Sequence, residues 1–295
     1  MVDFTVVLVL IAVLCLILVF LSISISRLIK KRKSRKRYSQ PSVLSEPSVL
    51  SDKEEVSQGA IPQLLHRIWI GPRVFPHRKD LRWIQSFDDL NSGFTRVVWR
   101  DDDIRTLLSS SYQEYEDIYS RYKLNIQRAD LARYLVLYEY GGMYADLDVS
   151  AVRPMSELHT AHPDKKFFCF VEIVLTEERA NAIGNGEPIR KIGKEKGFGV
   201  IPEDQERIAS DLVSCTPKHP MMLKILEEVK RRSVLKVKKQ YDVFYTTGPD
   251  LFTTVVHRHL KDNPDVMVVD KEISDSFFIH HGSALWKTFI NFPFR

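Results

Sequence analysis

The stretch IQRADLARYLVLYEYGGMYADLDVSAV, residues 126–152, decides the fold, because it predicts a helix, a glycine turn and a strand in succession. Leu131 and Leu135 lie four positions apart, which places them on one apolar stripe of a helix over residues 126–140. The glycine pair at 141–142 then offers the backbone conformations with which helices commonly end. The sequence therefore predicts a helix that leads through a tight turn into a strand.

The strand predicted after the glycines enters a turn and carries two aspartates. MYADLDVSAV alternates in character, and residues two apart on an extended strand share a face. We therefore expect Asp146 and Asp148 to project together, while Leu147 points into the core. Two carboxylates held side by side repel one another unless a cation lies between them. Oxygen ligands of this kind suit Mg²⁺ or Mn²⁺, especially when a substrate phosphate completes the shell, so the pair predicts a divalent-metal site.

Composition and charge exclude other classes of function. With 44% hydrophobic residues, 11% aromatic residues and 12 glycines, the 295-residue chain has enough material for a packed core. Residues 1–40 contribute +7 to the net charge of +5 and residues 41–59 contribute −3, so residues 60–295 carry +1. A nearly neutral globular part argues against nucleic-acid binding. The three cysteines predict neither a disulfide framework nor a structural zinc site.

The first 59 residues predict a membrane anchor and a stem. The apolar run from Phe4 to Ile25 is long enough to cross a bilayer, which needs about 20 residues. No basic region precedes the run and no small-x-small site follows it, so we expect a retained anchor over residues 1–26 instead of a cleaved signal peptide. Residues 27–59 combine a basic cluster with a Ser-rich near-repeat, which predicts a flexible stem.

The globular part, residues 60–295, begins with alternating strands and helices. LLHRIWI at 64–70 predicts a buried strand, a helix is expected around residues 81–87, and FTRVVW at 94–99 predicts a second strand. Three aspartates at 101–103 would begin another helix. This order predicts an α/β sandwich with a mainly parallel sheet. Later strands are expected to complete that sheet, at KFFCFVEI (166–173), IASDLVSC (208–215), VMVVD (266–270) and FFIHH (277–281).

Trp69 lies near the end of the first predicted strand. In open α/β sheets ligands bind beyond the carboxyl ends of the strands. The indole is therefore in a position to stack on a flat base, although packing in the core is an equally good interpretation of its position alone.

The stretch RADLARYLVLYEYGGMYADLD resembles the DxD-containing sugar transferases of glycosyltransferase family 32. HRIWIG at 66–71, TGP at 247–249 and HHGSALW at 280–286 support the resemblance, which runs from about Ile61 to the C-terminus. The family includes the fungal inositol-phosphoceramide mannosyltransferases and the α-1,6-mannosyltransferases of the Golgi. It implies a GT-A-type, Rossmann-like nucleotide-sugar transferase domain over residues 60–295.

The resemblance also implies roles for single residues. Asp146 looks like the first DxD aspartate, which contacts the donor ribose or the metal, and Asp148 looks like the direct metal ligand. Asp130 and Arg133, one helical turn apart, look like the pair that contacts the donor sugar.

Four further positions match the family. Tyr144 is similar to a donor-contacting tyrosine, and Trp69 matches the tryptophan that stacks on the nucleotide base. In related metal-dependent transferases a C-terminal histidine or acidic group completes the metal shell, and here His280 or His281 could do so. Adjacent histidines on a strand point to opposite faces, so we expect at most one of them to do so.

The activity implied by the resemblance is retaining, metal-dependent transfer of a hexose to a hydroxyl of a glycolipid or glycan. Mn²⁺ or Mg²⁺ and a nucleotide sugar are the expected cofactor and donor, with GDP-mannose favoured and UDP-linked hexoses left open. The resemblance favours a Golgi membrane with the domain in the lumen. The basic cluster after the anchor favours a cytosolic domain under the positive-inside rule, so the side of the membrane stays open.

Two interpretations of other classes compete. YADLDVS superficially matches the motif of aspartyl-phosphate phosphatases, in which the first aspartate is a nucleophile, but that motif follows an apolar strand, and here it follows a glycine turn. A non-catalytic, membrane-tethered sugar-binding module is the other possibility. A module that only binds sugar would not need all four of Asp130, Arg133, Asp146 and Asp148. All four are present in this chain.

Overall fold

The computed structural model describes residues 59–71, 78–174, 191, 193–198 and 206–282. The predicted anchor, the stem up to residue 58 and the C-terminal part of HHGSALW lie outside these residues. Within the described part of the chain, no helix has the length and apolar character that a membrane span requires.

A six-stranded sheet lies at the centre of the fold, with strand order β2-β1-β3-β6-β5-β7. Its strands are β1 (Leu64–Ile68), β2 (Thr95–Trp99), β3 (Gly142–Ala145), β5 (Phe167–Val174), β6 (Glu206–Cys215) and β7 (Val266–Val269). β1 is parallel to β2 and β3, and β5 is parallel to β7, whereas β6 is antiparallel to β3 and β5. Within this sheet β6 alone runs in the opposite direction, so the carboxyl ends of the other five strands share one edge. The predicted parallel-rich α/β sheet is confirmed.

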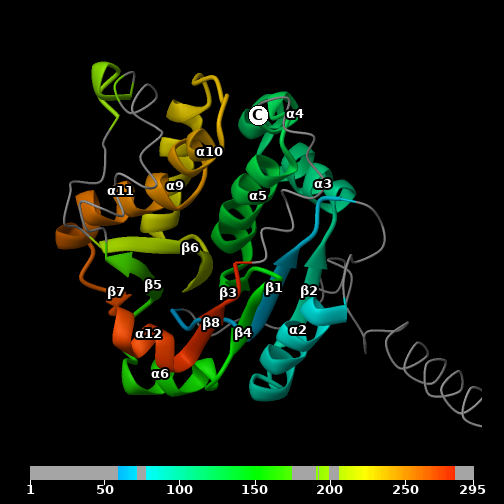
Figure 1. Cartoon of the computed structure of the whole chain (residues 1–295), viewed down its shortest axis with the longest axis vertical. Helices are drawn as coiled ribbons and strands as arrows, with labels where there is room; N and C mark the ends of the chain where they lie inside the picture. Colours follow the sequence, from blue (N-terminus) through cyan, green and yellow to red (C-terminus); the bar gives the residue numbers. More distant parts are fainter. Residues whose placement is uncertain (1–58, 72–77, 175–190, 192, 199–205, 283–295) are drawn as a thin grey trace, which may run out of the picture. The chain divides into compact units, whose positions relative to one another are not determined.

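Helices cover both faces of the sheet (Figure 1). One face packs against α3 (Asp101–Ser111), α4 (Gln113–Arg121), α5 (Asn125–Tyr140), α9 (Pro220–Arg232) and α11 (Pro249–His259). The other packs against α2 (Arg78–Leu90), α6 (Met155–Ala161) and α12 (Lys271–Phe277). The short helices α10 (Gln240–Thr246) and η2 (Leu260–Asp262) flank α11. Alternate strand residues enter the two cores, as in the pair Met143 and Tyr144 of β3.

The predicted helix and glycine turn are both present. α5 ends at Tyr140, and Gly141 and Gly142 have φ of +61° and +87°. A Cβ atom on Gly141 would lie 2.5 Å from the backbone nitrogen of Pro217, so a side chain has no room there. The turn is also held by His66, whose Nε2 lies 2.9 Å from the Gly141 carbonyl oxygen.

Two predictions about strands are wrong. β3 ends at Ala145 and enters a turn, as expected, but the turn begins before the two aspartates, so Asp146 and Asp148 do not lie on the extended strand, and β4 (Val149–Ala151) follows the turn. The segment FFIHH does not close the central sheet either. It forms β8 (Phe278–His280), which pairs antiparallel with β4 in a separate two-stranded sheet. The turn after Ala145 causes both differences, because it directs the chain out of the central sheet and leaves β4 free to pair elsewhere.

Candidate functional site

The two DxD aspartates lie in a turn beyond the carboxyl end of β3. The Val149 amide donates a hydrogen bond to the Asp146 carbonyl at 3.2 Å, which closes the turn over Leu147 and Asp148. Both carboxylates nevertheless line one cavity, as expected. A turn, and not the alternation of an extended strand, brings them there.

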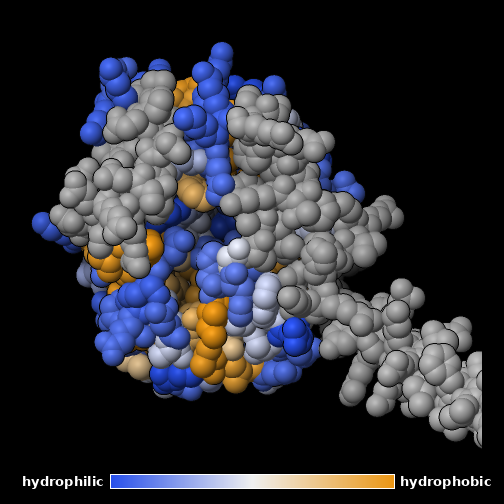
Figure 2. Space-filling view, in the orientation of Figure 1, coloured by the Kyte–Doolittle hydropathy of each residue, from blue (hydrophilic) through white to orange (hydrophobic). Residues whose placement is uncertain are grey.

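This cavity has a volume of about 380 Å³ and opens at the carboxyl edge of the sheet. Figure 2 shows the same face of the molecule hollowed near its centre. The cavity is lined by the end of β1, the first half of α5, the DxD turn, the ends of β5 and β6 that face this edge, and α10. The lining residues are Ile68, Trp69, Ile70, Asn125, Ile126, Ala129, Asp130, Arg133, Tyr144, Asp146, Leu147, Asp148, Glu172, Arg207, Ser210, Asp211, Gln240, Val243, Phe244, Gly248, Pro249, His280 and Gly282.

All the predicted site residues line this cavity except His281. Trp69 borders it from the end of β1 and is 8% exposed. The arrangement therefore brings the predicted base-stacking residue and the DxD carboxylates to the same cavity.

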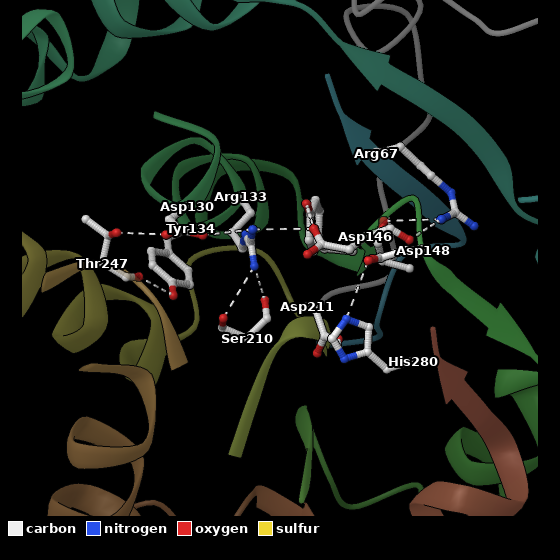
Figure 3. Close-up of polar contacts among 12 residues, drawn as sticks. Arg67, Asp130, Arg133, Tyr134, Asp146, Asp148, Ser210, Asp211, Thr247 and His280 are labelled. Carbon is white, nitrogen blue, oxygen red and sulfur yellow. Dashed lines mark hydrogen bonds and ion pairs between the residues drawn. The ribbon is translucent and has the colours of Figure 1, made fainter. Parts of the chain in front are cut away.

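Arg133 is the centre of the buried charge network (Figure 3). Its Nη2 lies 2.8 Å from Asp130 Oδ1 and 3.4 Å from Asp146 Oδ1, and its Nη1 donates to the Ser210 carbonyl at 2.7 Å. The guanidinium also lies over the Tyr144 ring, 4.9 Å from the centroid. Burial alone would lower the pKa of Arg133, but the surrounding carboxylates raise it above its usual value, so the side chain is a permanent cation here.

Asp130 is held on its other side by Thr247. The Thr247 hydroxyl donates to Asp130 Oδ2 at 2.7 Å, and the Tyr134 hydroxyl donates to the Thr247 carbonyl at 2.8 Å. Burial raises the pKa of Asp130 to about 6, against the opposing effect of Arg133. Thr247 is the first residue of the TGP segment, and its hydrogen bond to Asp130 does not follow from the sequence.

The backbone of the DxD turn is fixed from both neighbouring strands. Arg67 of β1 donates from Nη1 to the Asp146 carbonyl at 2.6 Å, and the Asp146 amide donates to the Asp211 carbonyl of β6 at 2.8 Å. The Tyr144 hydroxyl donates to Asp146 Oδ1. The position of the Asp146 carboxylate is therefore set by the fold before any ligand binds.

His280 lies between two carboxylates (Figure 3). Its Nε2 is 3.6 Å from Asp148 Oδ2, and its Nδ1 is 3.3 Å from Asp211 Oδ2. Burial would lower the pKa of His280, but the two carboxylates raise it to about 10. Burial raises the pKa of Asp211 to about 6. The pairing of Val149 with His280 across the β4–β8 sheet brings the histidine to this place.

His281 has other partners. Its Nε2 lies 2.8 Å from Ser150 Oγ, and its ring stacks on Trp83 with 4.1 Å between the ring centroids. The two histidines thus have different surroundings, as the alternation of a strand predicts. Of the two, His280 is the one whose ring contacts Asp148.

Asp211 is a cavity residue that the sequence analysis did not identify. Between the pairs Cys169↔Val213 and Val171↔Ile208, β6 has four residues and β5 has one. Such a bulge redirects side chains, and here Ser210 and Asp211 line the cavity. In the sequence, the indication of this role is that Asp211 is the single acidic residue of the predicted strand IASDLVSC.

The residues fit a divalent cation only if a ligand completes its shell. Within the described residues, no group of three or more His, Cys, Asp or Glu side chains is arranged to hold a metal ion. Oδ1 of Asp146 already contacts Arg133 and Tyr144. Asp148 and Oδ2 of Asp146 would therefore bind the cation together with diphosphate and water oxygens, the usual composition of a Mg²⁺ site on a phosphate substrate.

Residues 77–168 match the sequence profile of a family described as a glycosyltransferase sugar-binding region containing a DXD motif. Inositol phosphoceramide mannosyltransferase 1 of Schizosaccharomyces pombe is 24% identical over 195 residues, which cover 64% of this chain and 49% of that protein. Inositol phosphoceramide mannosyltransferase 3 of the same yeast is 35% identical over 102 residues, covering 34% and 27%. The chain thus spans about half or less of these curated relatives. The resemblance expected from the DxD stretch is confirmed.

Among solved structures, the PaToxG glycosyltransferase aligns with a TM-score of 0.42 at 17% identity, covering 68% of this chain and 70% of that one. Mouse xyloside xylosyltransferase 1 aligns with a TM-score of 0.39 at 14% identity, covering 80% and 95%.

Proposed function

Because residues 77–168 belong to the DXD-containing glycosyltransferase family, we propose that this chain is a metal-dependent glycosyltransferase. It moves a hexose from a nucleotide sugar to a hydroxyl of a glycolipid or glycan. The observation that carries the proposal is the single cavity bordered by Trp69, both DxD carboxylates and the buried pair of Asp130 and Arg133. The mannosyltransferase relatives support mannose from GDP-mannose as the donor, with a UDP-linked hexose as the alternative.

The nucleotide diphosphate would bind along the carboxyl edge of the sheet. Asp148 and Asp146 hold Mn²⁺ or Mg²⁺, which when bound neutralises the charge that develops on the departing diphosphate. Trp69, at the end of β1, contacts the base. The β1 and β6 contacts to the Asp146 backbone keep its carboxylate in place, so little reorganisation is needed when the donor enters.

The donor sugar would lie against Asp130 and Arg133. A guanidinium offers only donors and a carboxylate only acceptors, so together they bind a hydroxyl in both of its hydrogen-bonding roles. The first half of α5 presents both side chains to the cavity one helical turn apart.

We also propose that the anomeric configuration is retained. Among the described residues, each carboxylate that lines the cavity is already paired with a cationic side chain: Asp130 and Asp146 with Arg133, Asp148 and Asp211 with His280, and Glu172 with Arg207. A paired carboxylate is a poor nucleophile, which argues against a covalent sugar–enzyme intermediate. Retention, which the resemblance to glycosyltransferase family 32 implies, then requires the acceptor hydroxyl to attack from the side on which the diphosphate departs, and its proton passes to the leaving phosphate oxygen.

For the location in the cell we propose a Golgi membrane protein anchored by the apolar run from Phe4 to Ile25. Names of relatives that refer to inositol phosphoceramide, a membrane lipid, support a membrane-bound acceptor. Protease protection in sealed vesicles would decide the side of the membrane, because a lumenal domain resists digestion until detergent is added.

The test of the activity is a screen of nucleotide sugars for hydrolysis by the full chain, with and without Mn²⁺. Asp148→Asn should abolish hydrolysis while leaving the melting temperature near that of the wild type. Asp164→Asn, a change of the same kind at a side chain that is 70% exposed, should leave hydrolysis unchanged. Full, metal-independent turnover by the Asp148 variant would refute the proposal. Release of phosphate from an aryl phosphate would instead favour a phosphatase.

A further inference from the structure

The cavity continues past the residues assigned to the donor. Glu172 near the end of β5, Arg207 near the start of β6, and Gln240 and Phe244 of α10 line this further part, here called the β5 end. In the sheet, β5 lies three strands from β1, with β3 and β6 between them. Neighbouring strands are about 4.8 Å apart, so Trp69 and the β5 end are separated by about 14 Å. The DxD turn, at the end of β3, lies between them.

The β5 end is built around a buried guanidinium. Arg207 is 4% exposed, and its Nε lies 3.3 Å from Glu172 Oε2 and 3.2 Å from Asp250 Oδ1. The guanidinium lies over the Phe244 ring, 4.7 Å from the centroid. Burial would lower the pKa of Arg207, but the two carboxylates raise it. One buried cation therefore fixes a carboxylate and an aromatic ring in the wall of the cavity.

The charges of this region select against anions. Arg207 is compensated twice, by Glu172 and by Asp250, so the group as a whole carries one net negative charge. Among the described residues that line this part of the cavity, a phosphate would meet the Glu172 carboxylate and no cation beyond the compensated Arg207. A neutral hydroxyl, in contrast, can donate to Glu172, whose side chain is 30% exposed.

We propose that the β5 end is the acceptor subsite, and that it takes a neutral polyhydroxylated ring, either a sugar or a cyclitol. The inference rests on the proposed transferase function, which fills the Trp69 side and the DxD turn with the donor. Glu172 accepts hydrogen bonds from ring hydroxyls, Phe244 packs against the ring, and Arg207 is a positioning residue that acts through both. Any phosphate attached to the acceptor remains outside this part of the cavity.

The experiment compares Glu172→Gln with Glu206→Gln in the full chain. Glu206 lies next to Arg207 on β6 and does not line the cavity, so the control variant loses the same charge outside the proposed subsite. Arg207 keeps its ion pair with Asp250 in both variants, which protects the fold. Three quantities are measured: hydrolysis of the donor without acceptor, transfer to methyl α-mannoside or myo-inositol, and saturation-transfer NMR of these two acceptors.

For Glu172→Gln we expect unchanged donor hydrolysis, a rise of about 10- to 100-fold in the acceptor KM, and loss of the NMR signal, since a hydrogen bond to a charged group is lost. Glu206→Gln should match the wild type. The acceptor whose KM responds identifies the ring as a sugar or a cyclitol.

Other outcomes overturn the inference. If the acceptor KM and the NMR signal are the same in Glu172→Gln and wild type, the β5 end is not the acceptor subsite, even if donor hydrolysis is normal. Equal loss of donor hydrolysis and transfer in that variant would place Glu172 with the donor. A wild type that hydrolyses no nucleotide sugar would overturn the proposed function, and the NMR comparison would still decide whether neutral rings bind at the β5 end.

Discussion

The buried pair of Arg133 and Asp130 permits a quantitative prediction. Their side chains are 3% and 4% exposed and 2.8 Å apart, so solvent does not screen their interaction. Arg133→Met removes the cation and leaves Asp130 buried with only its bond from Thr247. Removing one member of a buried ion pair typically costs about 3–5 kcal/mol. For a domain of this size we expect the melting temperature to fall by roughly 6–20 °C.

A double-mutant cycle isolates the ionic contribution. Asp130→Asn alone should cost about 1–3 kcal/mol, because Arg133 keeps Asp146 at 3.4 Å and the Ser210 carbonyl at 2.7 Å. In the double variant no charge of the pair is left uncompensated. Its loss of stability should therefore be smaller than the sum of the single losses by about 1–3 kcal/mol.

The assay is thermal melting and urea unfolding of the full chain and its variants. Arg121→Met is the matched control, because Arg121 pairs with Asp117 on the surface with side chains 57% and 80% exposed. Its effect should stay within about 0.5 kcal/mol. Strictly additive losses in the cycle, or a cost of Arg133→Met no larger than that of the control, would refute the view that the pair is a coupled buried charge network.

Two further predictions concern stability. Burial depresses the pKa of His66 to about 4, below its usual 6.5, so the unfolded chain takes up the proton first; stability should be full above pH 6.5 and fall by up to about 3 kcal/mol towards pH 4. The free energy of unfolding, measured by urea titration at pH 7 and 4.5, should fall less between these two pH values in His66→Asn than in the wild type. An equal fall in both proteins would contradict this assignment. Gly142→Ala should cost more than Gly197→Ala in thermal melting: both have positive φ, but a Cβ on Gly142 would lie 2.7 Å from the Leu64 carbonyl oxygen, whereas nothing lies within 4 Å at Gly197. Equal falls in melting temperature in the two variants would mean that the backbone strain of a positive φ alone determines the effect.

The tautomer of His66 explains why its neutral form is required. The Trp99 indole donates to His66 Nδ1 at 3.1 Å, so Nε2 must carry the proton that His66 donates to the Gly141 carbonyl. Protonation of His66 Nδ1 would place its N–H group against the N–H group of the Trp99 indole, so that two hydrogen-bond donors would face each other. The histidine of the HRIWIG segment is thus structural, and it holds the glycine turn that leads into β3.

Local patterns in the sequence were enough to predict most elements. The helix of α5, the strands β1, β2, β5, β6 and β7, and the glycine turn follow from periodicity and from the conformational freedom of Gly141 and Gly142. These signals are short-range, because they depend on residues within about one or two helical turns or on alternate strand positions. The resemblance of the DxD stretch to known transferases added candidate residues, and all but His281 line the same cavity.

The sequence by itself therefore determined which segments form the scaffold, and it placed two carboxylates at the end of β3. Only the tertiary structure decided what surrounds them: Asp211 through the bulge in β6, His280 through its pairing with β4, and Arg67 through the neighbouring strand β1. Strand partners and register are set by contacts between residues at least 31 positions apart, and the pattern of a strand does not specify its partner. The electrostatics of the cavity depend on these distant pairings, because each carboxylate receives its cation or hydrogen bond from another element of the fold.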